Sequence, residues 1–254
     1  MRRAARGFTL VELAVVMAIV ALLLGTLMYT LSAQSEQRNF EETRRRLEAA
    51  RELLLAYAIV NGRLPCPATA ASTGDESPAG GGACTTYYGG WLPARTIGYQ
   101  VLDAQNFALD AWGNRIRYAV SSTLDTTVPT CAAPAANHFT TAANLKANGI
   151  TCSPSDLIVC KSATGITALA CGGAANQVMS QDLVAAIVFS VGKNGSTSPA
   201  GGGIDEAANL NGDRVFVFHT PSPPAAANGE FDDHLVWITV GELYGKMIAA
   251  GVLP

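Results

Sequence analysis

Charged residues are scarce in this chain of 254 residues, because only 15% of them are Asp, Glu, Lys or Arg, whereas soluble proteins average about 25%. The formal net charge is −3 and the isoelectric point is about 5.6. A general nucleic-acid-binding domain is strongly basic, usually with an isoelectric point above about 9, so no nucleic acid is expected among the partners. The hydrophobic content of 49% excludes a chain that is disordered throughout.

Patterns that mark catalytic sites are also missing. No Gly-x-Ser-x-Gly surrounds Ser190 or Ser196, so neither serine has the setting of a nucleophile beside His234. The segment 192–196 lacks the order of a phosphate-binding loop. No Cys-x-x-Cys pair or matching histidine spacing indicates zinc. We therefore expect no enzymatic activity, with a signal-anchored hydrolase as the alternative to be excluded.

The hydrophobic residues concentrate near the N-terminus. Residues 13–31 contain no charge and no proline, and as a helix they would be about 28 Å long, close to the thickness of the hydrocarbon core of a bilayer. Arg2, Arg3 and Arg6 precede them and would keep the N-terminus cytoplasmic. A cleaved signal peptide, with its shorter apolar region, is the alternative. We expect a transmembrane helix over about 13–31.

One ionisable residue, Glu12, lies at the edge of this apolar run, where a charge is costly and marks a functional site by default. It belongs to the string Gly7-Phe8-Thr9-Leu10-Val11-Glu12-Leu13. Together with the basic leader and the apolar helix, the string resembles the N-terminus of the type IV pilin and pseudopilin superfamily. That signature is a short basic leader ending in Gly, then Phe-Thr-Leu-Val/Ile-Glu. The resemblance covers residues 1–35.

The resemblance implies a maturation route and a role for Glu12. Residues 1–7 would be a leader, which a membrane prepilin peptidase cuts between Gly7 and Phe8 before it methylates the amino group of Phe8. Loss of the three leader arginines takes the net charge from −3 to −6. In filaments of the superfamily, a Glu at this place neutralises the N-terminus of the neighbouring subunit, and a shielded ion pair is favourable only when both partners are present. A plain carboxylate at the membrane edge is the alternative.

The helix is expected to continue beyond the apolar run, over residues 8–61. Ten of the seventeen residues from 36 to 52 are charged, with opposite charges four residues apart, as in an exposed helix. Asn61-Gly62 is a plausible helix stop. An apolar stripe with helical spacing, expected to pack on a globular head, comprises Phe40, Leu47, Leu54 and Ala58. A solvated helix without a partner is the alternative for 36–46.

Residues 62–254 are expected to form the head, and the fold class is α+β. Loop-like segments rich in small residues separate β-branched and aromatic runs at 116–120, 157–161, 185–191, 214–219 and 235–240, and a short helix is expected over 242–250. The expected fold is a long N-terminal helix packed on an antiparallel sheet with long loops. Two strings, 110–118 and 61–67, resemble segments of pilin-like proteins, which agrees with a pilin-like head.

The head contains all six cysteines of the chain. An even number of cysteines in an oxidising compartment favours three disulfides, although six cysteines allow fifteen pairings. We expect sequential pairs, each closing a short loop and contributing about 3 kcal/mol in the chain-entropy model. These pairs are Cys66–Cys84, Cys131–Cys152 and Cys160–Cys171.

Carboxylates and amides gather late in the chain, and alternating oxygen side chains around a glycine are typical of calcium loops. Major secretion pseudopilins bind calcium in a C-terminal loop, so the resemblance supports calcium as a possible cofactor. The full EF-hand spacing is absent, and a polar turn before a strand is the alternative. The candidate ligands are Asp205, Asn209, Asn211, Asp213 and Asp232.

The resemblance implies a minor pilin or pseudopilin. It would be anchored in the inner membrane with its head in the periplasm and would assemble with other pilin subunits through the N-terminal helix. A type IV pilus and a type II secretion pseudopilus remain equally open. The alternative function is a pilus-tip adhesin or DNA-uptake pilin that acts through loops of the head, among which the aromatic loop 87–91 is a candidate ligand contact.

Overall fold

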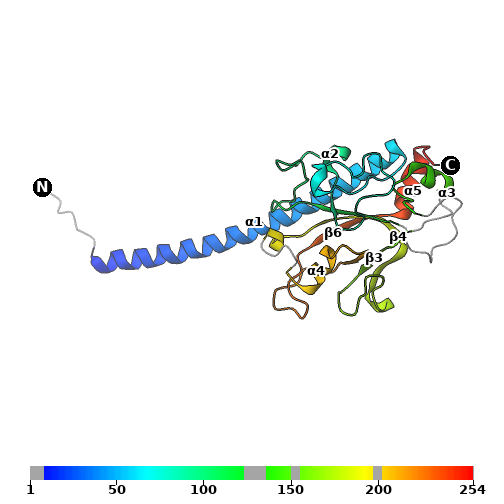
Figure 1. Ribbon diagram of the computed structural model, residues 1–254. Coiled ribbons are helices and arrows are strands. Elements are labelled where there is room, and N and C mark those ends of the chain that lie inside the picture. The colour runs from blue at the N-terminus through cyan, green and yellow to red at the C-terminus, as the bar shows by residue number, and fades with distance from the viewer. Residues whose placement is uncertain (1–8, 123–135, 150–154, 197–201, 254) are drawn as a thin grey trace. The chain divides into compact units, whose positions relative to one another are not determined.

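The computed structural model describes residues 9–122, 136–149, 155–196 and 202–253, and within these it leaves out the side chains of residues 24–33 and 196. Two compact units follow one another along the chain, with their boundary between Glu42 and Thr43. The fold class is α+β, as expected, with a long N-terminal helix followed by a mixed sheet (Figure 1).

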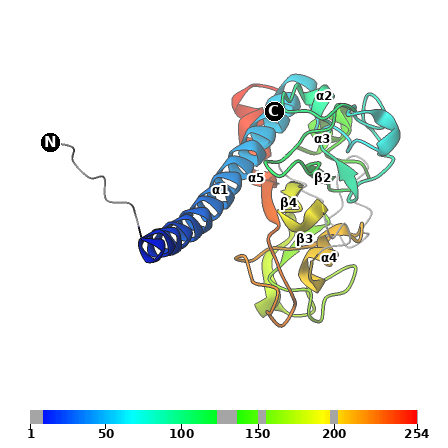
Figure 2. The same cartoon turned by 90° about the vertical axis from the view of Figure 1, so that its left-hand side faces the viewer.

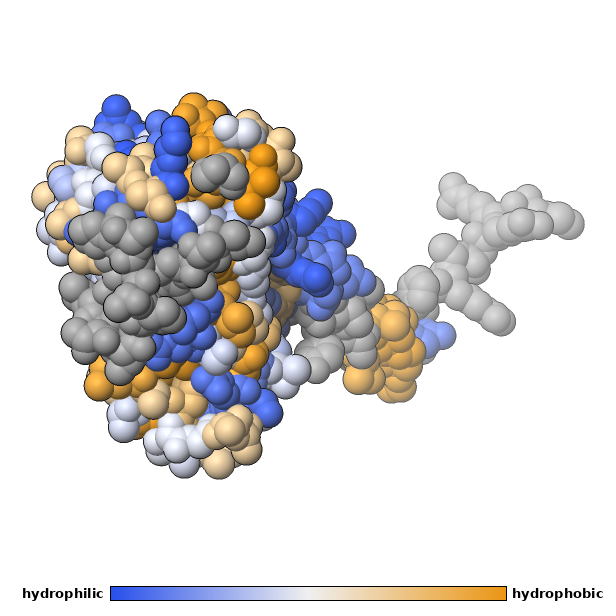
Figure 3. All heavy atoms as spheres, turned by 90° about the vertical axis from the view of Figure 1, so that its right-hand side faces the viewer, coloured by the Kyte–Doolittle hydropathy of each residue, from blue (hydrophilic) through white to orange (hydrophobic). Residues whose placement is uncertain are grey.

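Helix α1 comprises Leu10–Asn61, and it confirms the expected single helix over residues 10–61. The helix ends at Asn61, and the next residue, Gly62, has a backbone φ of 69°, the left-handed conformation that commonly terminates helices. In Figure 3, hydrophobic residues cover the first part of α1, and a hydrophilic stretch follows after grey atoms. The expected membrane span 13–31 extends into residues 24–31, whose side chains lie outside the described ones.

Among the described residues, no helix combines the length and the apolarity of a membrane span.

The sheet of the second unit has six strands, and β4 (Gln177–Ser190) lies at its centre. On one side of β4, strand β3 (Leu157–Cys160) pairs with residues 177–184 and strand β2 (Arg117–Val120) pairs with residues 186–189. On the other side, strand β6 (His234–Thr239) pairs with residues 184–190. Strand β1 (Gly90–Trp91) extends the sheet beyond β2. The expected strands are therefore confirmed, and β4 is longer than its apolar part 185–191 indicated.

The expectation of a wholly antiparallel sheet is wrong at one pair. Strand β5 (Val215–Val217) runs parallel to β3. Strand β4 runs antiparallel to β3 and so returns the chain to the starting end of β3. After helix α4 (Ile204–Leu210), β5 pairs with β3 instead of with β4, and a connection that passes over one strand in this way makes the pair parallel.

Helices cover both faces of the sheet. The C-terminal part of α1 and helix α5 (Val240–Ala249) lie on one face, while α4 lies on the other (Figures 1 and 2). The short helices α2 (Ala94–Ile97) and α3 (Ala142–Asn148) lie on the side of α1. Since both faces are covered, residues 184–190 of β4 are continuously buried.

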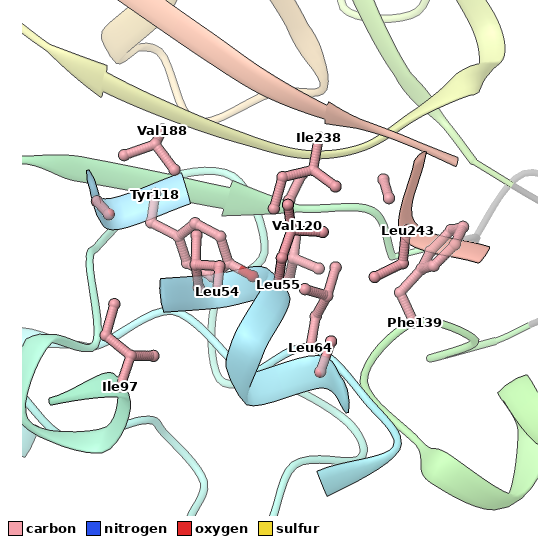
Figure 4. Packing of buried hydrophobic residues seen from close by; sticks show 14 of the residues in the cluster. Leu54, Leu55, Leu64, Ile97, Tyr118, Val120, Phe139, Val188, Ile238 and Leu243 are labelled. Carbon is pink, nitrogen blue, oxygen red and sulfur yellow. The ribbon is translucent and has the colours of Figure 1, made fainter. Parts of the chain in front are cut away.

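The core divides between the two faces by the strand alternation. Ala186 and Val188 of β4 belong to the cluster under α1 and α5, whereas Ile187 and Phe189 belong to the cluster on the other face. Figure 4 shows the first cluster, in which leucines of α1 lie against Tyr118 and Val120 of β2, Ile238 of β6 and Leu243 of α5.

The predicted stripe on α1 is confirmed where it lies in the second unit. Leu47, Leu54 and Ala58 are completely buried in the core. Polar contacts position the same face: Arg46 Nη1 donates to the carbonyls of Leu109 and Asp110 at 3.2 and 2.6 Å. Burial of each of the two leucines contributes about 1.5 to 3 kcal/mol, and this packing holds residues 43–61 to the head.

Two of the three expected disulfides are confirmed. Cys66–Cys84 has a Cα–Cα distance of 5.4 Å, and Cys160–Cys171 has one of 5.5 Å. The third expected pair, Cys131–Cys152, lies outside the described residues. The first bridge closes the loop that follows α1, and the second joins the end of β3 to the segment before β4.

Candidate functional site

The N-terminal motif contains the first candidate site. Gly7 and Phe8 lie outside the described residues. Thr9 Oγ1 accepts the backbone N–H of Glu12 at 3.2 Å, and the Glu12 carboxylate accepts the N–H and the hydroxyl of Thr9, both at 2.9 Å. This is a capping box, which satisfies N–H groups that the first helical turn cannot pair.

The capping box determines how Glu12 is presented. The side chain is exposed, and its charge lies at the helix N-terminus, where a carboxylate interacts favourably with the helix dipole. Glu12 therefore holds a defined geometry, with both hydrogen bonds from Thr9 made to its Oε2 atom.

The second candidate site is a cluster of three buried carboxylates, which we call the acidic cluster. Glu206 belongs to α4, and Asp232 and Asp233 directly precede β6. Their exposed fractions are 1%, 6% and 4%. One oxygen from each of the three lies within 4.8 Å of the others. Close packing of three buried acids makes it costly to ionise all of them.

Backbone and amide groups supply the hydrogen bonds of the acidic cluster. Asp232 Oδ2 accepts the N–H groups of Lys193 and Asn194 at 3.0 and 3.2 Å. Glu206 accepts the N–H of Asp232 at 2.6 Å and the side-chain amide of Asn194 at 2.9 Å. Asp232 Oδ1 is buried and has no hydrogen-bond partner among the described residues. One acceptor of the cluster is thus left unsatisfied.

The environment shifts the proton affinity of both aspartates. Burial, followed by the charge of Glu206, raises the pKa of Asp232 to about 7. Burial raises the pKa of Asp233 well above its usual range, although a hydrogen bond from the Asn209 amide at 2.7 Å opposes this. Without a cation, these carboxyls retain protons near neutral pH.

The geometry of the acidic cluster is suited to a divalent cation. Calcium binds oxygens at about 2.3 to 2.6 Å, so two ligands of one ion lie within about 5 Å of each other. The three carboxylate oxygens meet this limit. A bound cation would replace the retained protons and provide a partner for Asp232 Oδ1.

The predicted calcium ligands are only partly brought together. Asp232 belongs to the acidic cluster, and Asn209 contacts it through Asp233. Asp205 instead accepts the N–H of Ala163 at 2.5 Å and contacts His219 Nε2 at 3.1 Å. The sequence pattern indicated Asp205 as a calcium ligand. In the folded head, however, it is the next residue of α4, Glu206, that lies beside Asp232 and Asp233.

Asn211 and Asp213 form the polar turn that was the alternative to a calcium loop. The N–H of Asp213 donates to Asn211 Oδ1 at 2.8 Å, and Asp213 Oδ1 accepts the N–H of Val215 at 2.8 Å. These bonds start β5. The predicted ligand set left out Glu206 and Asp233, although both lie among the carboxylates that gather late in the chain, and Asp233 lies just before the expected strand 235–240.

Gly192 allows the chain to pass close to Asp232. Its φ is 64°, and a Cβ added there would lie 1.8 Å from Asp232 Oδ1. A side chain at this position would therefore combine backbone strain with a collision. The glycine lets the N–H groups of Lys193 and Asn194 reach the carboxylate.

The aromatic loop 87–91 is held by internal contacts. The hydroxyl of Tyr87 bonds to Asn137, and that of Tyr88 bonds to Asp156. The ring of Trp91 packs on Phe107 with a centroid distance of 5.5 Å. These contacts give the loop a structural role.

Comparison with known proteins identifies the N-terminal motif. Residues 2–28 match the family described as the prokaryotic N-terminal methylation motif, which is the signature of type IV pilins and pseudopilins. The predicted resemblance is therefore confirmed for this segment. No curated protein and no solved structure gives a significant match to the chain.

Proposed function

We propose that this chain is the precursor of a minor pilin or pseudopilin, a structural subunit of a type IV pilus or of a type II secretion pseudopilus. The observation that carries the proposal is the methylation motif at residues 2–28. The apolar sequence 13–31 and the long helix α1 that contains it agree with such a subunit. The number of loops in the head favours a low-copy subunit over a major one.

Processing by prepilin peptidase follows from the same motif. The peptidase cuts between Gly7 and Phe8 and methylates the amino group of Phe8. The precursor is anchored in the inner membrane through residues 13–31, with its head in the periplasm. The two disulfides of the head suit that oxidising compartment.

Assembly depends on Glu12. After cleavage, the amino group of Phe8 is the cation nearest to the apolar helix, and Glu12 of a neighbouring subunit provides its counter-ion. An unpaired charge within a packed bundle costs about 3 to 5 kcal/mol when its partner is removed. This cost selects the register in which subunits pack, and the capping box holds Glu12 in place for it.

The experiment uses Glu12→Ala with Glu41→Ala as the matched control. Glu41 is an exposed acid of the same helix that accepts a hydrogen bond from Gln37 at 3.0 Å. We expect cleavage and Phe8 methylation in both variants by mass spectrometry, and at least a tenfold loss of incorporation into filaments for Glu12→Ala only. Normal incorporation of Glu12→Ala would refute the assembly role, and an unmethylated wild-type protein would refute the maturation route.

We also propose that the calcium predicted for the head is bound by Glu206, Asp232 and Asp233. The distances within the acidic cluster and the unsatisfied Asp232 Oδ1 support this set. Its role would be structural, because it would join α4 to the start of β6. The first prediction of the Discussion tests it.

A further inference from the structure

Arg117, the first residue of β2, belongs to a row of arginine and aromatic side chains that contact one another in the head. Its guanidinium lies 4.9 Å from the centre of the Trp91 ring, and Trp91 packs on Phe107. The guanidinium of Arg115 lies 4.2 Å from the Phe107 ring on the same row. Both guanidiniums thus lie within the range of a cation–π attraction to an aromatic ring.

The two arginines differ in their counter-ions. Arg115 Nε contacts Asp103 Oδ2 at 2.6 Å, and its Nη2 donates to Gln105 at 2.9 Å. Arg117 donates only to the carbonyl of Gly89, at 3.4 Å, and among the residues that the structure describes it has no carboxylate partner. The charge of Arg115 is therefore balanced, whereas that of Arg117 is not.

The surroundings of Arg117 make the missing counter-ion costly. Its side chain is partly buried, and burial followed by the like charge of Arg115 lowers its pKa. A guanidinium carries five N–H donors in a planar fork, and a desolvated charge is stabilised only when it is paired. An anion beside Arg117 would offset the cost of burial and the repulsion from Arg115.

A cavity of about 260 Å³ opens beside this guanidinium. Polar and apolar groups share its wall, since Asn114, Val191 and Leu210 line it together with Trp91 and the two arginines. The side-chain amide of Asn114 is fixed by a hydrogen bond to the carbonyl of Gly192 at 2.6 Å. The volume suits a small group and excludes a folded segment of another protein.

We propose that this cavity binds a carboxylate group. The site has one unbalanced positive charge, which matches a monoanion, whereas a phosphate dianion would bring one negative charge in excess. The planar fork of arginine pairs with carboxylate through two parallel hydrogen bonds. The carboxylate belongs either to a small organic acid or to an acidic side chain of another subunit.

The test uses the full chain in detergent micelles, with sodium acetate titrated against sodium chloride at constant ionic strength. The readouts are the indole N–H signal of Trp91 and the guanidinium signals of Arg117 in NMR spectra. We expect a saturable shift in the wild type, with affinity reduced at least tenfold in Arg117→Gln. The control Arg95→Gln removes an exposed arginine that is already paired with Asp75 at 3.0 Å, and it should bind acetate like the wild type.

Further arms identify the ligand and guard against misfolding. N-acetylaspartate amide, which mimics an acidic side chain, is compared with acetate, and tighter binding of either assigns the source of the carboxylate. Arg117→Lys keeps the charge without the fork and should bind at least threefold more weakly with an unchanged melting temperature. A shift that does not saturate, one that persists in Arg117→Gln, or tighter binding of inorganic phosphate would overturn the proposal.

Discussion

Replacing Asp232 by Asn tests whether the acidic cluster binds protons or a cation at neutral pH. The amide resembles the protonated carboxyl and keeps an oxygen for the N–H groups of Lys193 and Asn194. In chelator at pH 8, we expect Asp232→Asn to be more stable than the wild type. Below about pH 4, where the carboxyl carries its proton in both the folded and the unfolded chain, the two proteins should differ little.

The magnitude follows from the raised pKa of Asp232. A carboxyl has an ordinary pKa of about 3.9, and here it is about 7. A raised folded-state pKa gives stability that is complete below about 3.9 and disappears as the pH rises through about 7. Between pH 5 and 8, the wild type should lose about 2 to 3 kcal/mol relative to the variant, or about 5 to 10 °C in melting temperature.

The comparison must be made between variants because other groups titrate in this range. Burial lowers the pKa of His138 to about 4, and burial followed by the charge of Arg44 lowers the pKa of His234. The stability that the two neutral histidines contribute is complete above about pH 6.5 and decreases as the pH falls. This pH dependence is opposite to that of Asp232. Subtracting the pH–stability profile of Asp232→Asn from that of the wild type removes the effect of the histidines, which both proteins share.

The assay is thermal unfolding of the full chain in detergent at pH 5 to 8, with chelator or with millimolar calcium. Calcium should stabilise the wild type at pH 8, by about 2.7 kcal/mol at a concentration 100 times the dissociation constant, and should have little effect on Asp232→Asn. The control is Asp75→Asn, an exposed acid 46% accessible to solvent. Parallel pH profiles for wild type and Asp232→Asn, together with no effect of calcium, would refute the reasoning.

Two further changes probe the contacts that hold the head together. Gly192→Ala should destabilise the head by about 3 kcal/mol or more and remove any effect of calcium, because the methyl group would collide with Asp232; thermal unfolding checks it, and wild-type stability would contradict the packing. Arg63→Leu should cost about 3 to 5 kcal/mol in urea unfolding, because it leaves Glu76 as a buried charge without its partner at 2.7 Å. Burial alone would raise the pKa of Glu76, but Arg63 lowers it. The stability that the ionised Glu76 gives the wild type should therefore disappear as the pH falls below about 4.5, and the variant should lack this pH dependence.

The sequence alone determined the features that depend on neighbouring residues. The apolar run and the charge pairs specify α1, because helical contacts join residues three or four apart. β-branched runs locate the strands, and the short spacing of Cys66–Cys84 and Cys160–Cys171 made sequential pairing the expectation that the structure confirms. The methylation motif is likewise a contiguous string.

The tertiary structure decided everything that depends on where distant segments meet. The parallel pairing of β5 follows from the path of α4, which carried no pairing signal in its sequence. Glu206 meets Asp232 and Asp233 because α4 presents it to the start of β6. The unbalanced charge of Arg117 arises because Asp103 lies beside Arg115 and no described carboxylate lies beside Arg117. Burial and charge balance are properties of the packed interior, and they cannot be assigned before the packing is known.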